Sequence, residues 1–154
     1  MDITHEPPGY QCPFCVLIAG GDTGLTGQAD VLRRTEGATA IMSPHWWPRN
    51  PGHALVVPNE HHENLYALPA EAGYAVMNLV REVAVAMREV LDGCQGVTTR
   101  QNNEPAGNQD VWHLHTHVVP RYPGDRLYRE GRIALVATEA RLAYARRLRA
   151  ALKG

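Results

Sequence analysis

The stretch Val111-Trp-His113-Leu-His115-Thr-His117-Val-Val119 places a histidine at every second position. The run ends at Pro120, and its alternation predicts a β-strand over residues 111–119. Successive side chains point to opposite faces of a strand, so all three imidazoles are expected on one face, with about 6.6 Å between neighbours. At that spacing the histidines can serve one extended site while contacting different atoms of a ligand.

A purely structural role is the alternative explanation for these histidines. A single histidine on a half-exposed strand face is usually structural. Three in strict alternation would need several separate partners, because each buried ring nitrogen requires a hydrogen bond. The pattern therefore favours a functional site built on imidazoles.

The sequence predicts four more strands and two helices. The strands are short apolar runs bounded by turn residues, and they cover 31–34, 38–42, 54–57 and 97–101. A long helix is predicted from Pro69 to Asp92, where apolar residues recur three and four positions apart, namely Val76, Met77, Val80, Val83, Ala84, Met87, Val90 and Leu91. A second helix over 138–153 is expected to carry a solvated basic face, and the first thirty residues are expected to form a tether and a loop. Strands and helices in this order indicate an α+β fold with an antiparallel sheet.

Composition excludes several classes of protein. The chain has 154 residues, a formal net charge of −1, 44% hydrophobic and 20% charged residues, which fits one folded domain and neither a disordered chain nor a nucleic-acid binder driven by bulk positive charge. We expect a core at about 10–122 and a helical carboxyl-terminal tail at about 123–154. The sequence shows no export signal and no apolar run long enough to span a membrane, so a cytoplasmic location is expected.

Cysteine spacing points to metal or redox chemistry. Cys12 and Cys15 form a CxxC pair, whereas Cys94 has no partner nearby in sequence and is expected to be a buried thiol. A redox motif would open a helix after a strand, but residues 16–19 run into Gly20 and Gly21, so redox chemistry is the weaker interpretation. A tetrahedral structural zinc needs two further ligands from elsewhere, and two free cysteines remain the alternative.

Three separated motifs together resemble the histidine-triad (HIT) superfamily of nucleotide hydrolases and transferases. The motif HxHxHxx corresponds to residues 113–119, and Gly52-His-Ala-Leu-Val-Val-Pro58 is similar to the GHxLVxP strand of that family. Asn102, Gly107 and Gln109 precede the triad at family-like spacing. The resemblance spans about Cys12 to Tyr122, which is most of the chain.

This resemblance implies a fold and a set of roles. It implies a five-stranded antiparallel sheet with a long helix packed on it, in a homodimer that places two nucleotide sites on one surface. His115 would attack the α-phosphorus of a nucleotide and become nucleotidylated, and a neutral imidazole is an available nucleophile at pH 7. His117 would donate to a phosphate oxygen or the leaving group, and Gln109 would contact the phosphate or the bridging atom. The remaining substrate-binding residues would be His53, Asn50, Asn102 and Gly107.

Some bacterial members that this chain resembles carry zinc on an amino-terminal CxxC. The matching ligands here are Cys12, Cys15, His113 and His61, which we prefer to His62 on spacing. The sequence departs from the pattern at Asn108, where many relatives have glycine, and at Asp110, where a hydroxyl residue is common. A carboxylate close to a phosphate would repel it, which leaves the role of Asp110 open.

The function expected from this resemblance is a nucleotide-binding hydrolase or transferase that acts at the α-phosphate. Its substrate would be a nucleoside phosphoramidate or a dinucleoside polyphosphate, and either water or phosphate would be the acceptor. Two other functions remain open: a zinc-dependent hydrolase with a catalytic metal on the histidine strand, and a nucleotide-sensing dimer with little catalysis.

Overall fold

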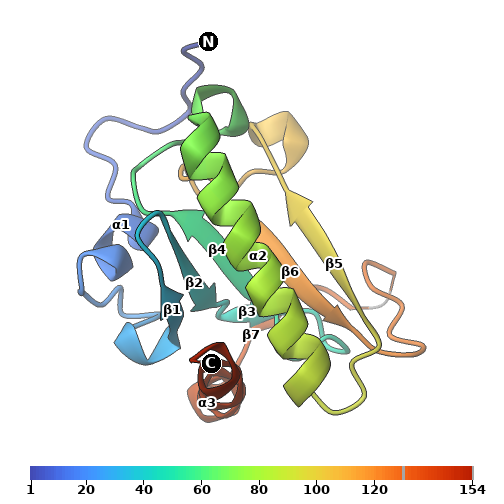
Figure 1. Cartoon of the computed structure of the whole chain (residues 1–154). Coiled ribbons are helices and arrows are strands. Elements are labelled where there is room, and N and C mark those ends of the chain that lie inside the picture. The colour runs from blue at the N-terminus through green and yellow to red at the C-terminus, as the bar shows by residue number, and fades with distance from the viewer. Residues whose placement is uncertain (130, 154) are drawn as a thin grey trace.

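A five-stranded antiparallel sheet with the strand order β1-β2-β4-β6-β5 forms the centre of the molecule (Figure 1). The computed structural model describes residues 1–129 and 131–153. The strands are β1 (Val31–Arg34), β2 (Ala38–Met42), β4 (Ala54–Pro58), β5 (Gly96–Gln101) and β6 (Thr116–Arg121). The α+β class and the antiparallel sheet predicted from the sequence are confirmed.

The long helix α2 (Ala70–Val90) crosses one face of this sheet (Figure 1). Its buried positions follow the helical period and pack on small and branched side chains of β2, β4 and β6. The buried helix residues are Val76, Leu79, Val80, Val83, Ala86 and Met87. The predicted helix is therefore confirmed, but Met77 is 61% exposed and does not belong to the core.

The helix α3 (Thr138–Leu152) closes one end of the same core, into which it inserts Ala145, Leu148 and Leu152. The prediction of a wholly solvated basic face is wrong for Arg141, which is 4% exposed and donates from Nε to Oδ1 of Asp30 at 2.6 Å. Removing one partner of such a buried pair would leave an uncompensated charge. The carboxyl-terminal helix is thus fastened to the segment that precedes β1.

The second face of the sheet carries a short helix, α1 (Pro13–Ile18). Phe14 and Leu17 pack there on Ile41, Leu55 and Val57. The expectation that residues 1–30 form a tether and a loop is wrong for residues 13–18, which are helical. Proline at the first helical position and the Cys12 side chain, which caps the helix, favour a helical turn before Gly20 ends it.

The strand of the histidine motif begins later than predicted, at Thr116 rather than at residue 111. Pairing with β4 extends only from Ala54–Val118 to Val56–Thr116. Pro58 has no N–H group with which to continue the ladder, and the N–H of Leu114 donates instead to the carbonyl of His62 at 2.7 Å. His113 and His115 therefore precede the strand and His117 lies within it.

A second sheet of two strands, β3 (His45–Trp46) and β7 (Ala134–Leu135), was not predicted. Two-residue strands have no measurable alternation, and these strands lie far apart in the sequence. Within the described part of the chain, no helix combines the length and the apolar character needed to cross a membrane.

Candidate functional site

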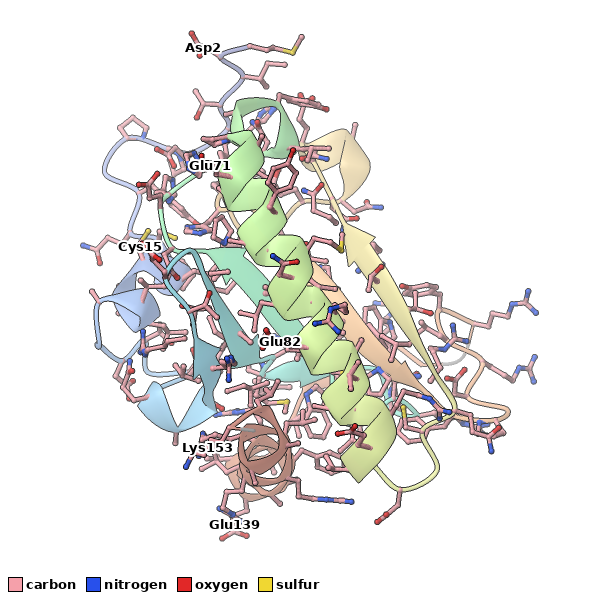
Figure 2. The ribbon with its side chains drawn as sticks, viewed as in Figure 1. Asp2, Cys15, Glu71, Glu82, Glu139 and Lys153 are labelled. Carbon is pink, nitrogen blue, oxygen red and sulfur yellow. The ribbon has the colours of Figure 1, made fainter. Side chains whose placement is uncertain are left out.

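Four side chains from three separate segments converge beside α1. Cys12 and Cys15 flank the start of that helix, His61 follows β4, and His113 precedes β6. One ligand atom from each residue lies within 4.8 Å of the ligand atoms of the other three. Figure 2 shows Cys15 at α1, apart from α2, which carries Glu71 and Glu82. The structure therefore brings together all four predicted metal ligands and leaves His62 outside the cluster.

The distances within this cluster fit a tetrahedral zinc ion. Zinc bonds of about 2.0 Å to nitrogen and 2.3 Å to sulfur imply edges of about 3.3 Å between two nitrogens and about 3.6 Å between nitrogen and sulfur. The Nδ1 atoms of His61 and His113 lie 3.1 Å apart, and Sγ of Cys12 and of Cys15 lie 3.3 and 3.6 Å from Nδ1 of His113. The donor set is thus already placed for a metal.

Hydrogen bonds fix the tautomers of both metal-site histidines. Nε2–H of His113 donates to the carbonyl of Pro58 at 2.9 Å, and Nε2–H of His61 donates to a carboxylate oxygen of Glu6 at 2.8 Å. Because both acceptors lack a proton, each neutral ring carries its lone pair on Nδ1. Two lone pairs facing each other at 3.1 Å repel unless a cation lies between them. Glu6 was not predicted to lie at the site, because a single glutamate in the amino-terminal segment has no distinguishing pattern.

Burial and a backbone hydrogen bond fix the orientation of the His115 ring. The residue is 3% exposed, and its Nδ1–H donates to the carbonyl of His113 at 2.8 Å. The lone pair of the neutral ring is therefore on Nε2. The ring of Phe14 lies 5.4 Å from the His115 ring and holds it from the side of α1. Phe14 was also missed, since its position inside the CxxC motif does not reveal which ring it contacts.

His53 and His117 form a buried neutral pair next to His115. Nδ1–H of His53 donates to the carbonyl of His45 at 2.8 Å, so its Nε2 accepts the Nδ1–H of His117 at 3.0 Å. Burial lowers the pKa of His53 to about 4 and that of His117 to about 2. This hydrogen bond leaves the lone pair of the neutral His117 ring on Nε2.

The depressed pKa of His53 makes a prediction about acid stability. The unfolded ring takes up a proton at about pH 6.5, whereas the native ring does so only at about pH 4. The unfolded state therefore binds more protons between these two pH values, so the free energy of unfolding decreases as the pH falls through this window. At 1.36 kcal/mol per pKa unit, this group accounts for a decrease of about 3 kcal/mol. Denaturant titrations of wild type and His53→Asn at pH 7 and pH 4.5 check this. We expect the free energy of unfolding to decrease less between pH 7 and pH 4.5 in the variant than in wild type. An equal decrease in both proteins would contradict the lowered pKa of His53.

A cavity of about 370 Å³ opens in front of these histidines. His53, His115 and His117 line it, together with apolar side chains of Phe14, Leu17, Leu25, Ile41, Leu55 and Ile133. These apolar side chains come from α1, the glycine-rich loop after it, the second face of the sheet and the segment before β7. A cavity that combines apolar side chains with three imidazoles suits a ligand with a flat apolar part and a polar group.

Four other residues were predicted to bind substrate but do not line this cavity in the part of the chain that the structure describes: Asn50, Asn102, Gly107 and Gln109. Asn50 is fully buried, and its Nδ2 donates to the carbonyl of Pro120 and to Asp125. Asn102 Nδ2 donates to the carbonyl of Asn108, and Gly107 is exposed in a short 3-10 turn. The amide of Gln109 is bonded entirely to backbone groups of Glu63, Val111 and Glu104. The sequence identified these four as site residues by position, and the structure shows them supporting the loops around the site.

Asp110 lines the same cavity, with its carboxylate beside the ring of His115. Its Oδ1 is 3.4 Å from Nε2 of His115, while 80% of its side chain is exposed. A hydrogen bond from His115, made when its Nε2 carries a proton, holds the pKa of the Asp110 carboxyl below its usual value, so this carboxyl is an anion at neutral pH. A negative charge therefore occupies the space in front of the ring that an anionic substrate would have to enter.

Comparisons with known proteins agree with this geometry. A HIT domain model matches residues 28–124. The protein hit of Bacillus subtilis is 37% identical over 72% of this chain and 71% of its own length, and an adenosine 5′-monophosphoramidase of Schizosaccharomyces pombe is 28% identical over 71% of this chain and 74% of its own. A zinc-bound histidine triad family protein from Mycobacterium smegmatis is 30% identical, with a TM-score of 0.75 over 92% of this chain and 93% of that one. The chain belongs to the HIT family.

Proposed function

We propose that this protein is a nucleotide-binding hydrolase that cleaves at the α-phosphate through a nucleotidyl-histidine on His115. The observation that carries the proposal is the orientation of His115, whose Nδ1–H is held by the carbonyl of His113 while the ring lines the cavity. The similarity to a monophosphoramidase of Schizosaccharomyces pombe supports the class of reaction. The apolar side chains of the cavity would hold the nucleoside.

The proposed reaction has two displacements. In the first, the lone pair on Nε2 of His115 forms a bond to the α-phosphorus, and the bond from phosphorus to the bridging oxygen or nitrogen breaks, with its electron pair going to the leaving group. A proton that enters with the substrate binds Nε2 of His117, whose affinity for it is raised by the anionic phosphate, and this residue then passes the proton to the leaving group. In the second displacement, water attacks phosphorus and gives a proton to Nε2 of His117. The phosphorus–nitrogen bond breaks with its electron pair returning to Nε2 of His115, and a nucleoside monophosphate and neutral His115 are released.

We propose a structural role for zinc at Cys12, Cys15, His61 and His113. Four protein ligands complete a tetrahedral site and leave no open position for substrate, which favours a structural over a catalytic metal. A bound zinc would join the amino terminus to the sheet and hold the backbone of His113, whose carbonyl orients His115. The zinc-bound relative from Mycobacterium smegmatis supports the identity of the metal.

We also propose that the chain forms a homodimer through its outer strand β5 and the neighbouring part of α2. β5 lies at the edge of the sheet, and Tyr74 and Met77 on α2 are 68% and 61% exposed. An unpaired strand edge beside exposed apolar side chains is a surface that a second copy can cover. Sedimentation velocity distinguishes a monomer from a dimer directly.

A substrate panel tests the proposed activity. Adenosine 5′-phosphoramidate and diadenosine tetraphosphate are incubated with the purified protein, and the products are separated by chromatography. Release of AMP from either compound supports cleavage at the α-phosphate. Absence of turnover over the whole panel contradicts the proposal and would favour a nucleotide-sensing role.

Replacing Asp110 is expected to increase nucleotide affinity. Two unit charges about 4 Å apart in a water-exposed setting repel by about 1 kcal/mol, which corresponds to about fivefold in affinity. We therefore expect Asp110→Asn and Asp110→Ser to bind AMP about fivefold more tightly at low ionic strength, as measured by calorimetry. A weaker affinity in both variants would show instead that the carboxylate positions His115 for binding.

A further inference from the structure

A row of paired residues crosses the sheet from the cavity to the outer edge. Ile41 on β2 pairs with Leu55 on β4, Leu55 pairs with His117 on β6, and His117 pairs with Arg100 on β5. Directly paired residues project from the same face of a sheet, and adjacent strands lie about 4.8 Å apart. Ile41 and Leu55 line the apolar cavity on one side of His117. Arg100 lies one strand beyond His117 on the other side, towards the edge of the sheet.

The guanidinium of Arg100 packs against two aromatic rings that also contact each other. Its central carbon lies 5.3 Å from the ring centre of Trp47 and 5.1 Å from that of Tyr128, and these rings meet edge to face at 5.2 Å. Trp47 is 7% exposed, so this support is part of the packed structure. The aromatic contacts fix the plane of the guanidinium and contribute to stabilising its charge.

This cation lacks a polar partner in the part of the chain that is described. The Nε atom of Arg100 is buried without a hydrogen bond, and no carboxylate of residues 1–129 or 131–153 forms an ion pair with it. A buried donor without an acceptor is unfavourable. A planar guanidinium that packs against these rings and has no polar partner among the described residues presents N–H groups that match the geometry of a phosphate, which it binds through two parallel hydrogen bonds.

The Arg100 cluster is physically connected to the reaction centre. Trp47, which supports Arg100, also lies 5.1 Å from the ring of His53, and Nε2 of His53 accepts the Nδ1–H of His117 at 3.0 Å. The positive charge of Arg100 contributes to lowering the pKa of both histidines. Its field therefore reaches the place where charge develops on a leaving group.

We propose that Arg100, packed against Trp47 and Tyr128, binds the phosphate on the leaving-group side of the scissile bond, which makes nucleotides with two or more phosphates the preferred substrates. The inference rests on the proposed function, because it places the nucleoside in the apolar cavity and the α-phosphate at His115 and His117. The cross-sheet row then directs the next phosphate towards β5. An anionic leaving group gains a charge-assisted contact there that the amine of a phosphoramidate does not make.

Binding of two matched nucleotides tests this inference without requiring turnover. The probes are AMP and α,β-methylene-ADP, which adds one phosphate through a bridge that hydrolysis cannot break. We expect wild type to bind α,β-methylene-ADP about tenfold more tightly than AMP, which is typical of one charge-assisted contact. Arg100→Met is expected to remove this preference while leaving AMP affinity within about twofold. Arg100→Lys, which keeps the charge without the planar fork, should retain part of the preference and serves as the variant with the smaller structural change.

Arg81→Met is the matched control, because Arg81 is exposed on α2 on the other side of the sheet and the substitution removes the same charge. It should keep the full tenfold preference. An equal preference in wild type and Arg100→Met, or equal weakening of both probes with a lower melting temperature, overturns the inference and makes Arg100 a structural contact. A preference that depends on Arg100 in a protein that cleaves no nucleotide would support the phosphate contact and contradict the proposed catalysis, so the two failures are distinguishable.

Discussion

Replacing His115 by alanine is expected to lower kcat/KM by at least about 10⁴-fold, because the variant has no nucleophile for the first displacement. The ring is 3% exposed and its Nδ1–H is already committed to the carbonyl of His113, so Nε2 is the atom available to attack. Nucleotide affinity should change much less than turnover, since the apolar side chains of the cavity are unaltered. Steady-state kinetics on the preferred substrate of the panel measures the loss.

The covalent intermediate gives a second measurement of the same assignment. Wild-type protein quenched at alkaline pH during turnover should show a mass increase of one nucleotidyl group, located on the peptide that contains His115. The variant should show none. His62→Ala is the matched control, because it removes a nearby imidazole that lies outside both the metal cluster and the cavity. Full activity in His115→Ala would identify a different nucleophile.

Replacing Cys12 by serine is expected to abolish stoichiometric zinc binding and to destabilise the fold by about 3–5 kcal/mol. The cluster joins residues that lie far apart in the sequence, so loss of the metal releases α1 and the amino-terminal segment from the sheet. Metal content per chain and melting temperature, each with and without a chelator, measure the two effects. The remaining folded fraction should still form the nucleotidyl-histidine, because His115 itself lies outside the cluster.

Cys94→Ser provides the control for this substitution. Cys94 is buried and its thiol donates to the carbonyl of Gly96, a contact that a serine hydroxyl can replace. The control should retain its zinc and most of its stability. Loss of turnover in proportion to metal, at unchanged melting temperature, would contradict a structural zinc and favour the metal-dependent hydrolase instead.

Local pattern predicted most of the secondary structure, and its errors have physical causes. The helix over 69–92 and the strands near 31, 38, 54 and 97 follow from periodicity and turn residues, and the structure places elements there. The motif strand was placed five residues too early, because its alternation continues beyond the end of the pairing with β4. The helix α1 was missed because six residues before a glycine pair are too few for a helical period.

The sequence predicted the positions of these side chains better than it predicted their roles. Spacing selected His61 over His62, and the structure brings His61 to the cluster. Spacing could not show that the amide of Gln109 is bonded to backbone groups or that Asn50 is fully buried. Hydrogen-bond partners of these residues lie on other loops, and their positions depend on the path of the whole chain.

The sequence by itself determined the chemistry available to this protein: three alternating histidines, a CxxC pair, a long amphipathic helix and enough strands for one sheet. These features follow from residue type and local period, which do not depend on distant contacts. Only the tertiary structure decided which nitrogen carries the proton in the neutral rings of the site histidines, the convergence of the four predicted metal ligands, and the position of Arg100 beyond His117. Each depends on a carbonyl, ring or strand brought close by folding, because hydrogen bonds and cross-strand pairs act through space over a few ångströms and not along the chain.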